Sequence, residues 1–222
     1  MTTRRPVTYG TADAARAYVA AVLGAAGELT QLGPAYLSAA PQVRALPRWP
    51  ELRAALAAML PGVPLADWSE VTMPELTGRD ERAAWLAAHH RAVVVVSLRE
   101  GTRRPVGPGV LAEAQAFAAA SRPVLVFTGR RLAAWPDCRT RPAPTRRGWP
   151  VAVWLDVPDM PPRPLPTLAA SLRALGVADP AAIARASGRA PGGGPAPSPR
   201  PSPPRPGPPM PAWRPAQARN HA

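Results

Sequence analysis

Six consecutive residues, Ala92 to Ser97, constrain the fold of this chain more than any other part of the sequence. The segment reads Ala-Val-Val-Val-Val-Ser, without alternation of polar and apolar side chains. A strand of this kind is apolar on both faces, which is typical of an inner strand of a parallel sheet covered by helices on both sides. The run therefore predicts an α/β domain.

The residues that follow complete a strand–helix–strand unit. A loop over Leu98 to Pro108 leads to a helical segment, Val110 to Ser121, which Gly109 opens. Pro123 to Phe127 then supplies a second buried strand. Such a unit connects its parallel strands by a right-handed crossover, so we expect a mostly parallel sheet.

Helical periodicity and turn residues place further elements along the chain. The expected elements are a short strand at Pro6 to Tyr9, helices starting near Thr11 or Asp13, between Pro50 and Pro61, from Gly78 to His90 and around Leu168 to Leu175, a strand at Val151 to Leu155, and a short helix at Gly129 to Ala134. Gly176 is expected to end one helix, and Asp179-Pro180 to begin the next.

From Ser187 onward the sequence lacks the apolar side chains that a core needs. Proline, arginine and glycine dominate there, which predicts a disordered tail over residues 187–222 after an α/β domain over residues 1–186. Arg200 to Pro206 matches an RxxPxxP pattern suited to an SH3-type groove. We expect a solvated linker or solubilising tail instead, because such matches are frequent in this composition.

The basic residues raise the question of a nucleic-acid partner. The formal net charge is +13, and all 27 basic residues are arginine. One basic group lies in the tail and another in a loop-like segment from Arg130 to Arg147. Base-stacking aromatic residues do not interleave with these arginines. This absence weighs against a nucleic-acid module. The alternative function that stays open is a non-catalytic α/β binding or adaptor module whose Arg-rich loop and tail contact nucleic acid or a protein partner.

Cysteine and hydropathy exclude several classes of protein. Cys138 is the sole cysteine, so neither an intramolecular disulfide nor a Cys-based zinc site can form, and we expect no metal and no cofactor. The apolar run from Ala92 to Val96 is far too short to span a membrane, and Asp13 and Arg16 interrupt any signal peptide. A cytoplasmic protein without a membrane partner is the expectation.

The loop and helix start from Val106 to Glu113 form the candidate site. Ligands of open α/β sheets bind where the carboxyl ends of strands meet helix N-termini, whose N–H groups can hold an anion or a sugar hydroxyl. Gly107 and Gly109 would permit close approach of a ligand. Glu113 would lie about one turn into the helix and close to the crevice. The alternative is an ordinary acidic residue near a helix start beside a turn-forming glycine pair.

Ala92 to Phe127 resembles the nucleoside 2-deoxyribosyltransferase-like group and the related phosphoribohydrolase families with a Gly-rich loop. The matching residues are Val93 to Val96, Gly109, Glu113, Ala116 to Ala120 and Arg122-Pro123-Val124. The resemblance implies a Rossmann-like three-layer fold and chemistry at an N-glycosidic bond. It also implies that Glu113 is the nucleophile or the ligand of the ribose.

Neighbouring residues extend this hypothesis. Protonation of the departing base needs a second group, for which Glu100 is the nearest candidate in the sequence. Ser97 would contact the substrate at the strand end, and Arg99 or Arg104 could hold a phosphate. The leading prediction is a nucleoside- or nucleotide-binding protein that cleaves or transfers an N-glycosidic bond. Enzymes of these families often complete their sites across subunits, so a homo-oligomer is an open alternative.

Overall fold

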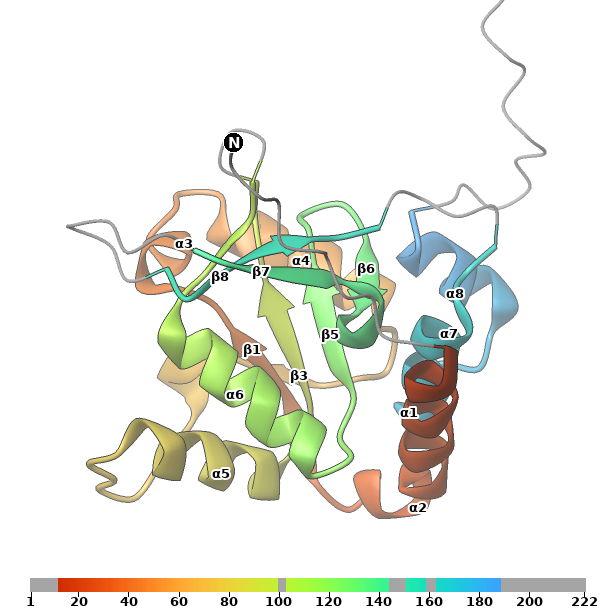
Figure 1. Cartoon of the computed structure of the whole chain (residues 1–222), viewed down its shortest axis with the longest axis horizontal. Helices are drawn as coiled ribbons and strands as arrows, with labels where there is room; N and C mark the ends of the chain where they lie inside the picture. Colours follow the sequence, from red (N-terminus) through yellow and green to blue (C-terminus); the bar gives the residue numbers. More distant parts are fainter. Residues whose placement is uncertain (1–11, 100–102, 144–150, 159–162, 189–222) are drawn as a thin grey trace, which may run out of the picture. The chain divides into compact units, whose positions relative to one another are not determined.

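A five-stranded sheet in the order β2-β1-β3-β5-β6 forms the centre of the fold (Figure 1). The computed structural model describes residues 12–99, 103–143, 151–158 and 163–188 of the chain. The sheet comprises β1 (Gly33–Ser38), β2 (Leu65–Ala66), β3 (His90–Val96), β5 (Val124–Phe127) and β6 (Leu132–Ala134). The first four run parallel, and β6 pairs antiparallel with β5. The sheet is thus mostly parallel, as predicted.

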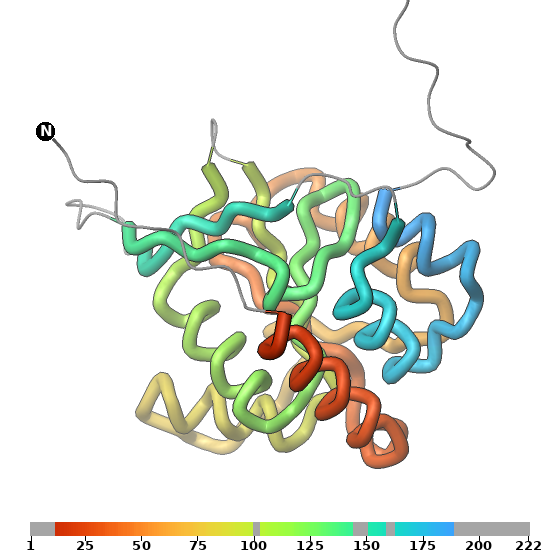
Figure 2. Tube along the Cα trace, turned by 45° about the vertical axis from the view of Figure 1, so that its right-hand side comes forward, coloured from red at the N-terminus to blue at the C-terminus, as the bar shows by residue number. Residues whose placement is uncertain are grey.

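Helices cover both faces of this sheet. The helices are α1 (Ala12–Gly24), α2 (Ala26–Leu29), α3 (Pro41–Arg44), α4 (Trp49–Met59), α5 (Arg79–His89), α6 (Pro108–Ala119), α7 (Pro166–Ala174) and α8 (Pro180–Ala186), with 3-10 turns η1 (Trp68–Glu70) and η2 (Trp135–Asp137). Val93 and Val95 pack against α5 and α6, whereas Val94 and Val96 pack against α4, α7 and α8. The fold is therefore a Rossmann-like three-layer α/β domain, and Figure 2 shows α1 running alongside α7.

The order in which strands are added to the sheet reverses between β1 and β3. These strands are parallel neighbours, with Ser38 opposite Val95. The chain leaves β1 toward α4 on one face and leaves β3 toward α6 on the other face. A crevice at the carboxyl ends of two such strands is the usual ligand position in open α/β sheets.

A second, antiparallel sheet lies near the carboxyl ends of the central strands (Figure 1). It consists of β4 (Pro105–Val106), β8 (Val153–Asp156) and β7 (Arg139–Pro142) in the order β4-β8-β7. Val106 and Leu155 pack against Val126 of β5 and Ala133 of β6. The strand expected at Val151 to Leu155 thus belongs to this small sheet, and it fixes the segment that carries Arg103 and Arg104.

Two features differ from the sequence-based expectations. The short helix expected at Gly129 to Ala134 is wrong, because Leu132–Ala134 forms β6. Gly129 adopts φ +88°, which permits a tight turn after β5, and β6 pairs with the edge that β5 would otherwise leave open. The sequence reasoning also missed β1, the neighbour of the central strand.

Two expectations concern residues that the structure does not describe, and the expected cap of α8 is confirmed. The strand expected at Pro6 to Tyr9 and the tail beyond Gly188 lie outside the described residues. Asp179 caps α8 as predicted, accepting hydrogen bonds from the backbone N–H groups of Ala181 at 2.9 Å and Ala182 at 3.1 Å. Among the described residues, no helix combines the length and the apolar character needed to cross a membrane.

Candidate anion-binding site

A cavity of about 630 Å³ opens at the carboxyl ends of β3 and β5. Its walls come from the residues after β3, the segment before β4, the turn between β5 and β6, and the start of α4. The described residues that line it are Arg48, Leu52, Leu98, Arg99, Arg104, Thr128, Gly129, Arg130, Arg131 and Gly188. Five of them are arginines, and none of those described is acidic. The volume lies within the usual range for small-molecule sites.

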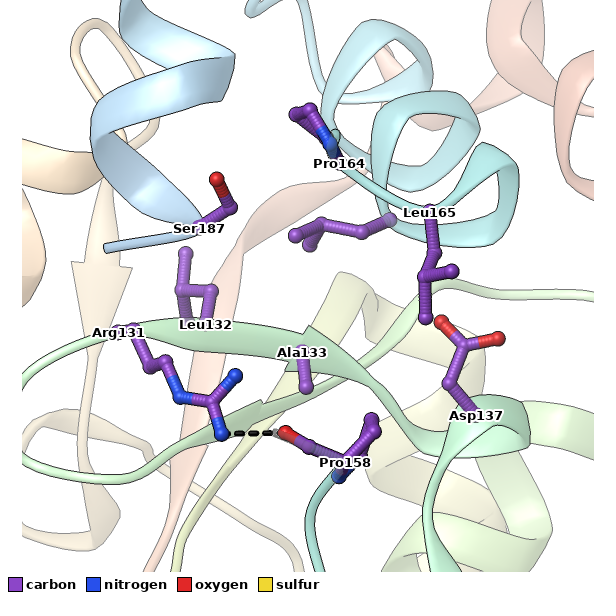
Figure 3. Close-up of a pocket in the computed structure, with 9 residues that line it drawn as sticks. Arg131, Leu132, Ala133, Asp137, Pro158, Pro164, Leu165 and Ser187 are labelled. Carbon is purple, nitrogen blue, oxygen red and sulfur yellow. Dashed lines mark hydrogen bonds between the residues drawn. The ribbon is translucent and has the colours of Figure 1, made fainter. Parts of the chain in front are cut away.

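Two of the arginines are anchored at the base of the site. Arg104 is half-buried, and its Nη1 donates a hydrogen bond to the carbonyl oxygen of Ser97 at 2.7 Å. Arg131 is half-buried as well, and its Nη2 donates to the carbonyl oxygen of Pro158. Figure 3 shows this hydrogen bond in a second, smaller pocket, which Arg131 and Pro158 line together with Asp137. An arginine side chain carries five N–H donors, so one bond to a carbonyl leaves most of each fork for a ligand.

The remaining arginines, Arg48, Arg99 and Arg130, are exposed around the cavity. Within the part of the chain that the structure describes, no carboxylate lies at salt-bridge distance from any of the five cavity arginines. Asp137 is close to Arg131 in sequence, but its carboxylate accepts a hydrogen bond from Thr167. The described lining of the cavity therefore concentrates positive charge without a compensating carboxylate.

The electrostatics of Arg104 reflect this crowding. Burial is the largest cause that lowers the pKa of its guanidinium, and the charges of Arg99 and Arg131 lower it further. Like charges in a partly desolvated site repel, and a bound anion would remove that repulsion. The start of α4 adds to the field, because Arg48 is its N-cap and Leu52 lies in its first turns, and both line the cavity.

A second polar feature lies at the strand reversal. The Ser38 hydroxyl at the end of β1 donates a hydrogen bond to Oε2 of Glu113, which lies in the second turn of α6. Ser38 is fully buried, and Glu113 is partly exposed. Glu113 is not among the residues that line the arginine cavity. The structure thus ties the predicted catalytic carboxylate to a serine of the neighbouring strand.

Two opposing effects act on the Glu113 carboxyl. Burial raises its pKa above the usual value, whereas the hydrogen bond from Ser38 and the positive charges of Arg44 and Arg82 lower it, with a net upward shift. The carboxylate in turn raises the pKa of Tyr36, although burial contributes more to that shift. A raised pKa is typical of functional carboxylates and also occurs in structural ones.

Comparisons with family models, curated proteins and solved structures gave no significant match. The interpretation of the site therefore depends on the geometry. Among the described residues, no group of three or more His, Cys, Asp or Glu side chains could hold a metal ion.

The structure distributes the predicted site residues over three positions. Arg99 and Arg104 meet in the cavity. Ser97 lies beneath it, with its carbonyl bound to Arg104 and its buried Oγ without a hydrogen-bond partner. Gly107 and Gly109 lie at the start of α6, where Gly107 is the N-cap. Glu113 joins Ser38, and Glu100 lies outside the described residues.

Sequence reasoning did not assign several residues of these sites. Arg130 and Arg131 stood out as part of a basic loop, but nothing local places them beside Arg99. Arg48 precedes a helix without a distinctive motif, and it reaches the cavity through the packing of α4 on the sheet. Ser38 could have been found through the short apolar segment before it, which ends in a polar residue as β3 does at Ser97.

Proposed function

We propose that this protein binds a nucleotide and places the phosphate part of that ligand in the arginine cavity. The observation that carries the proposal is the cluster of five arginines, with no acidic residue among the described lining, in a cavity of about 630 Å³ at the strand ends. Arginine forks match the geometry of phosphate oxygens and remain charged at any physiological pH.

The uncharged part of the ligand has apolar surface available. Leu52 and Leu98 line the same cavity, and Gly129 leaves its wall free of a side chain. A sugar or base edge can pack against such a surface while the arginines hold the phosphate. Arginines that converge on one cavity suit a small ligand better than a long polyanion, which needs a continuous basic surface. Salt-sensitive binding of random DNA without binding of nucleotides would favour the adaptor alternative.

Calorimetric titration of the full chain with nucleotides and the matching nucleosides tests the proposal. We expect nucleotides to bind and Arg104→Gln to weaken binding by at least about tenfold, since charged hydrogen bonds to phosphate are lost. Arg173→Gln is the control, because Arg173 is exposed on α7 and does not line the cavity. Circular dichroism establishes that each variant is folded. Equal affinity for nucleoside and nucleotide would contradict the proposal.

The hydrogen bond between Ser38 and Glu113 favours a second candidate function, chemistry at the N-glycosidic bond. A carboxylate at the strand reversal, held by one hydroxyl and largely removed from water, can stabilise oxocarbenium-like charge or attack the anomeric carbon. The resemblance to deoxyribosyltransferase-like proteins supports the same role for Glu113. Ser38 would orient the carboxylate, and Glu100 stays a prediction for the acid that protonates the base.

Release of free base on incubation with nucleosides and nucleotides tests this function. We expect Glu113→Gln to abolish the release, because the amide keeps the shape of the side chain and its acceptor oxygen but carries no charge. Glu75→Gln, at an exposed loop position, is the matched control and should leave the rate unchanged. A Glu113→Gln variant with full activity would remove Glu113 from the chemistry. A wild-type protein that binds nucleotides without releasing base would restrict the protein to binding.

A further inference from the structure

We infer that the ligand of the arginine cavity carries a chain of two or more phosphates. This inference rests on the proposed nucleotide-binding function and specifies its substrate class. From the sequence, only Arg99 or Arg104 was expected to contact a phosphate. The structure adds Arg48, Arg130 and Arg131 from two other segments to the same cavity.

The balance of charge is the first argument. A single phosphate ester carries about −1.5 to −2 charges near neutral pH. It would neutralise about two guanidinium groups and leave the rest of the five-arginine cluster facing one another. A diphosphate or triphosphate carries more negative charge along its length. Such a chain can neutralise the positive charge of the cavity by itself. The described lining contains no acidic residue that could do so.

The placement of the arginines is the second argument. Arg104 and Arg131 are half-buried and anchored to backbone carbonyls, so they form a fixed inner pair. Arg48, Arg99 and Arg130 are exposed, so they form an outer set. One phosphate has too few oxygens to pair with five guanidinium forks at once. A chain that extends from the inner pair outward gives each set its own phosphate.

The volume of the cavity agrees with an extended ligand. A water molecule accounts for about 30 Å³ of liquid, and one phosphate group is only a few times larger. The cavity of about 630 Å³ has room for further phosphates as well as for the sugar that packs against its apolar wall. Thr128 also lines the cavity from the β5–β6 turn, but its Oγ1 already donates to the carbonyl oxygen of Arg131 at 3.2 Å. The arginines are therefore the principal ligand donors.

The test is calorimetric titration of the full chain with adenosine, AMP, ADP and ATP, and with phosphate, pyrophosphate and tripolyphosphate. EDTA in the buffer keeps divalent cations from neutralising the phosphates. We expect affinity to rise by about tenfold or more from AMP to ADP, because the second phosphate engages additional arginines. The double variant Arg48→Gln/Arg130→Gln should lose most of this gain while retaining AMP binding through Arg104 and Arg131.

The matched control is Arg79→Gln/Arg173→Gln, which removes the same charge from two exposed positions outside the cavity. It retains every arginine of the tail, so it also controls for unspecific attraction of polyanions. Equal affinity for AMP and ATP would overturn the phosphate chain, as would an equal loss of ATP affinity in both double variants. Equal affinity for ATP and tripolyphosphate would instead support the phosphate chain and contradict the nucleotide proposal. The two conclusions can thus fail separately.

Discussion

The Ser38 hydroxyl donates a hydrogen bond to Oε2 of Glu113, joining the sheet to helix α6 across 75 positions of the sequence. Ser38 ends β1, and Glu113 comes from the helix that follows β3, so the bond spans the strand reversal. It is the one side-chain hydrogen bond shown for Glu113 within the described residues. Removing either partner should therefore affect both stability and titration.

Ser38→Ala should destabilise the protein by about 1–3 kcal/mol at neutral pH, because a largely desolvated carboxylate loses its donor. The pKa of Glu113 should rise further, since the hydroxyl lowers it in the wild type. Urea unfolding of the wild type, both single variants and the double variant with Glu113→Gln measures the coupling between the two residues. Strictly additive effects would mean that the hydrogen bond contributes nothing to stability.

Glu113→Gln should change the pH dependence of stability. The folded-state pKa of Glu113 lies above its usual value of 4.5, so the folded state binds this proton more tightly than the unfolded state. Its stabilising contribution is complete below the unfolded-state pKa and is lost as pH rises through the folded-state pKa. The glutamine side chain of the variant does not titrate, so the variant does not lose this contribution. Its stability relative to the wild type should therefore increase as pH rises from the unfolded-state pKa through the folded-state pKa, and remain constant above it.

Urea unfolding at a series of pH values from about 4 to 8 measures this difference. Asp137 also has a pKa raised mainly by burial, but it titrates in both proteins and cancels in the comparison. A difference between the proteins that does not vary with pH would show that Glu113 titrates alike in the folded and unfolded states.

The parts of the fold that the sequence predicted are those whose signal is local. The valine run of β3 needs apolar neighbours on both faces, and it has them in the structure. The β1 strand was missed because Gly33 and Pro34 begin it and Ala35 has low strand propensity. Its extended conformation is stabilised by pairing with β3, a contact between residues far apart in the sequence.

The candidate site also contains residues that a local sequence signal predicted and residues that it did not. Arg99 and Arg104 follow the central strand directly, so their place at its carboxyl end was predictable. Arg48 and Arg130 reach the cavity only through the packing of α4 and the turn after β5. The partner of Glu113 was likewise hidden, because Ser38 belongs to the strand that sequence reasoning missed. Tertiary packing, which no local pattern encodes, brings these residues together.

Gly129 should not tolerate a side chain. It adopts φ +88°, and a Cβ there would lie 3.2 Å from Cδ2 of Leu98, a residue of the cavity wall. Gly129→Ala should therefore cost about 1–2 kcal/mol and weaken nucleotide binding. Gly109→Ala is the control, because a Cβ in this first turn of α6 meets nothing within 4 Å and alanine favours the helix.

Thermal unfolding and nucleotide titration of both glycine variants provide the measurements. Gly109→Ala should be as stable as the wild type or more stable by up to about 1 kcal/mol. If the Gly109→Ala variant binds nucleotide with normal affinity, the ligand does not need to approach the backbone closely at the start of α6. An unchanged melting temperature for Gly129→Ala would contradict the requirement for glycine in this turn.

The arginine cavity should reduce the stability of the ligand-free protein. Arg99 and Arg131 repel Arg104, and no carboxylate in the described part of the chain offsets the cluster. Arg48→Gln/Arg130→Gln removes two further like charges from the same cavity. It should raise stability by up to about 1 kcal/mol, which corresponds to a rise of about 2–4 °C in melting temperature. Sites built for charged ligands commonly have this cost.

Added salt and the matched double variant test whether repulsion in the arginine cavity causes the loss of stability. Arg79→Gln/Arg173→Gln changes the net charge equally, and its positions lie at the start of α5 and near the end of α7, where the helix dipoles have opposite effects. It should change the melting temperature less than the cavity variant at low salt. The difference should shrink as salt screens the repulsion, because partly exposed charges interact weakly beyond a Debye length of about 10 Å at 0.1 M. Equal shifts would mean that the cluster carries no stored repulsion for an anion to relieve.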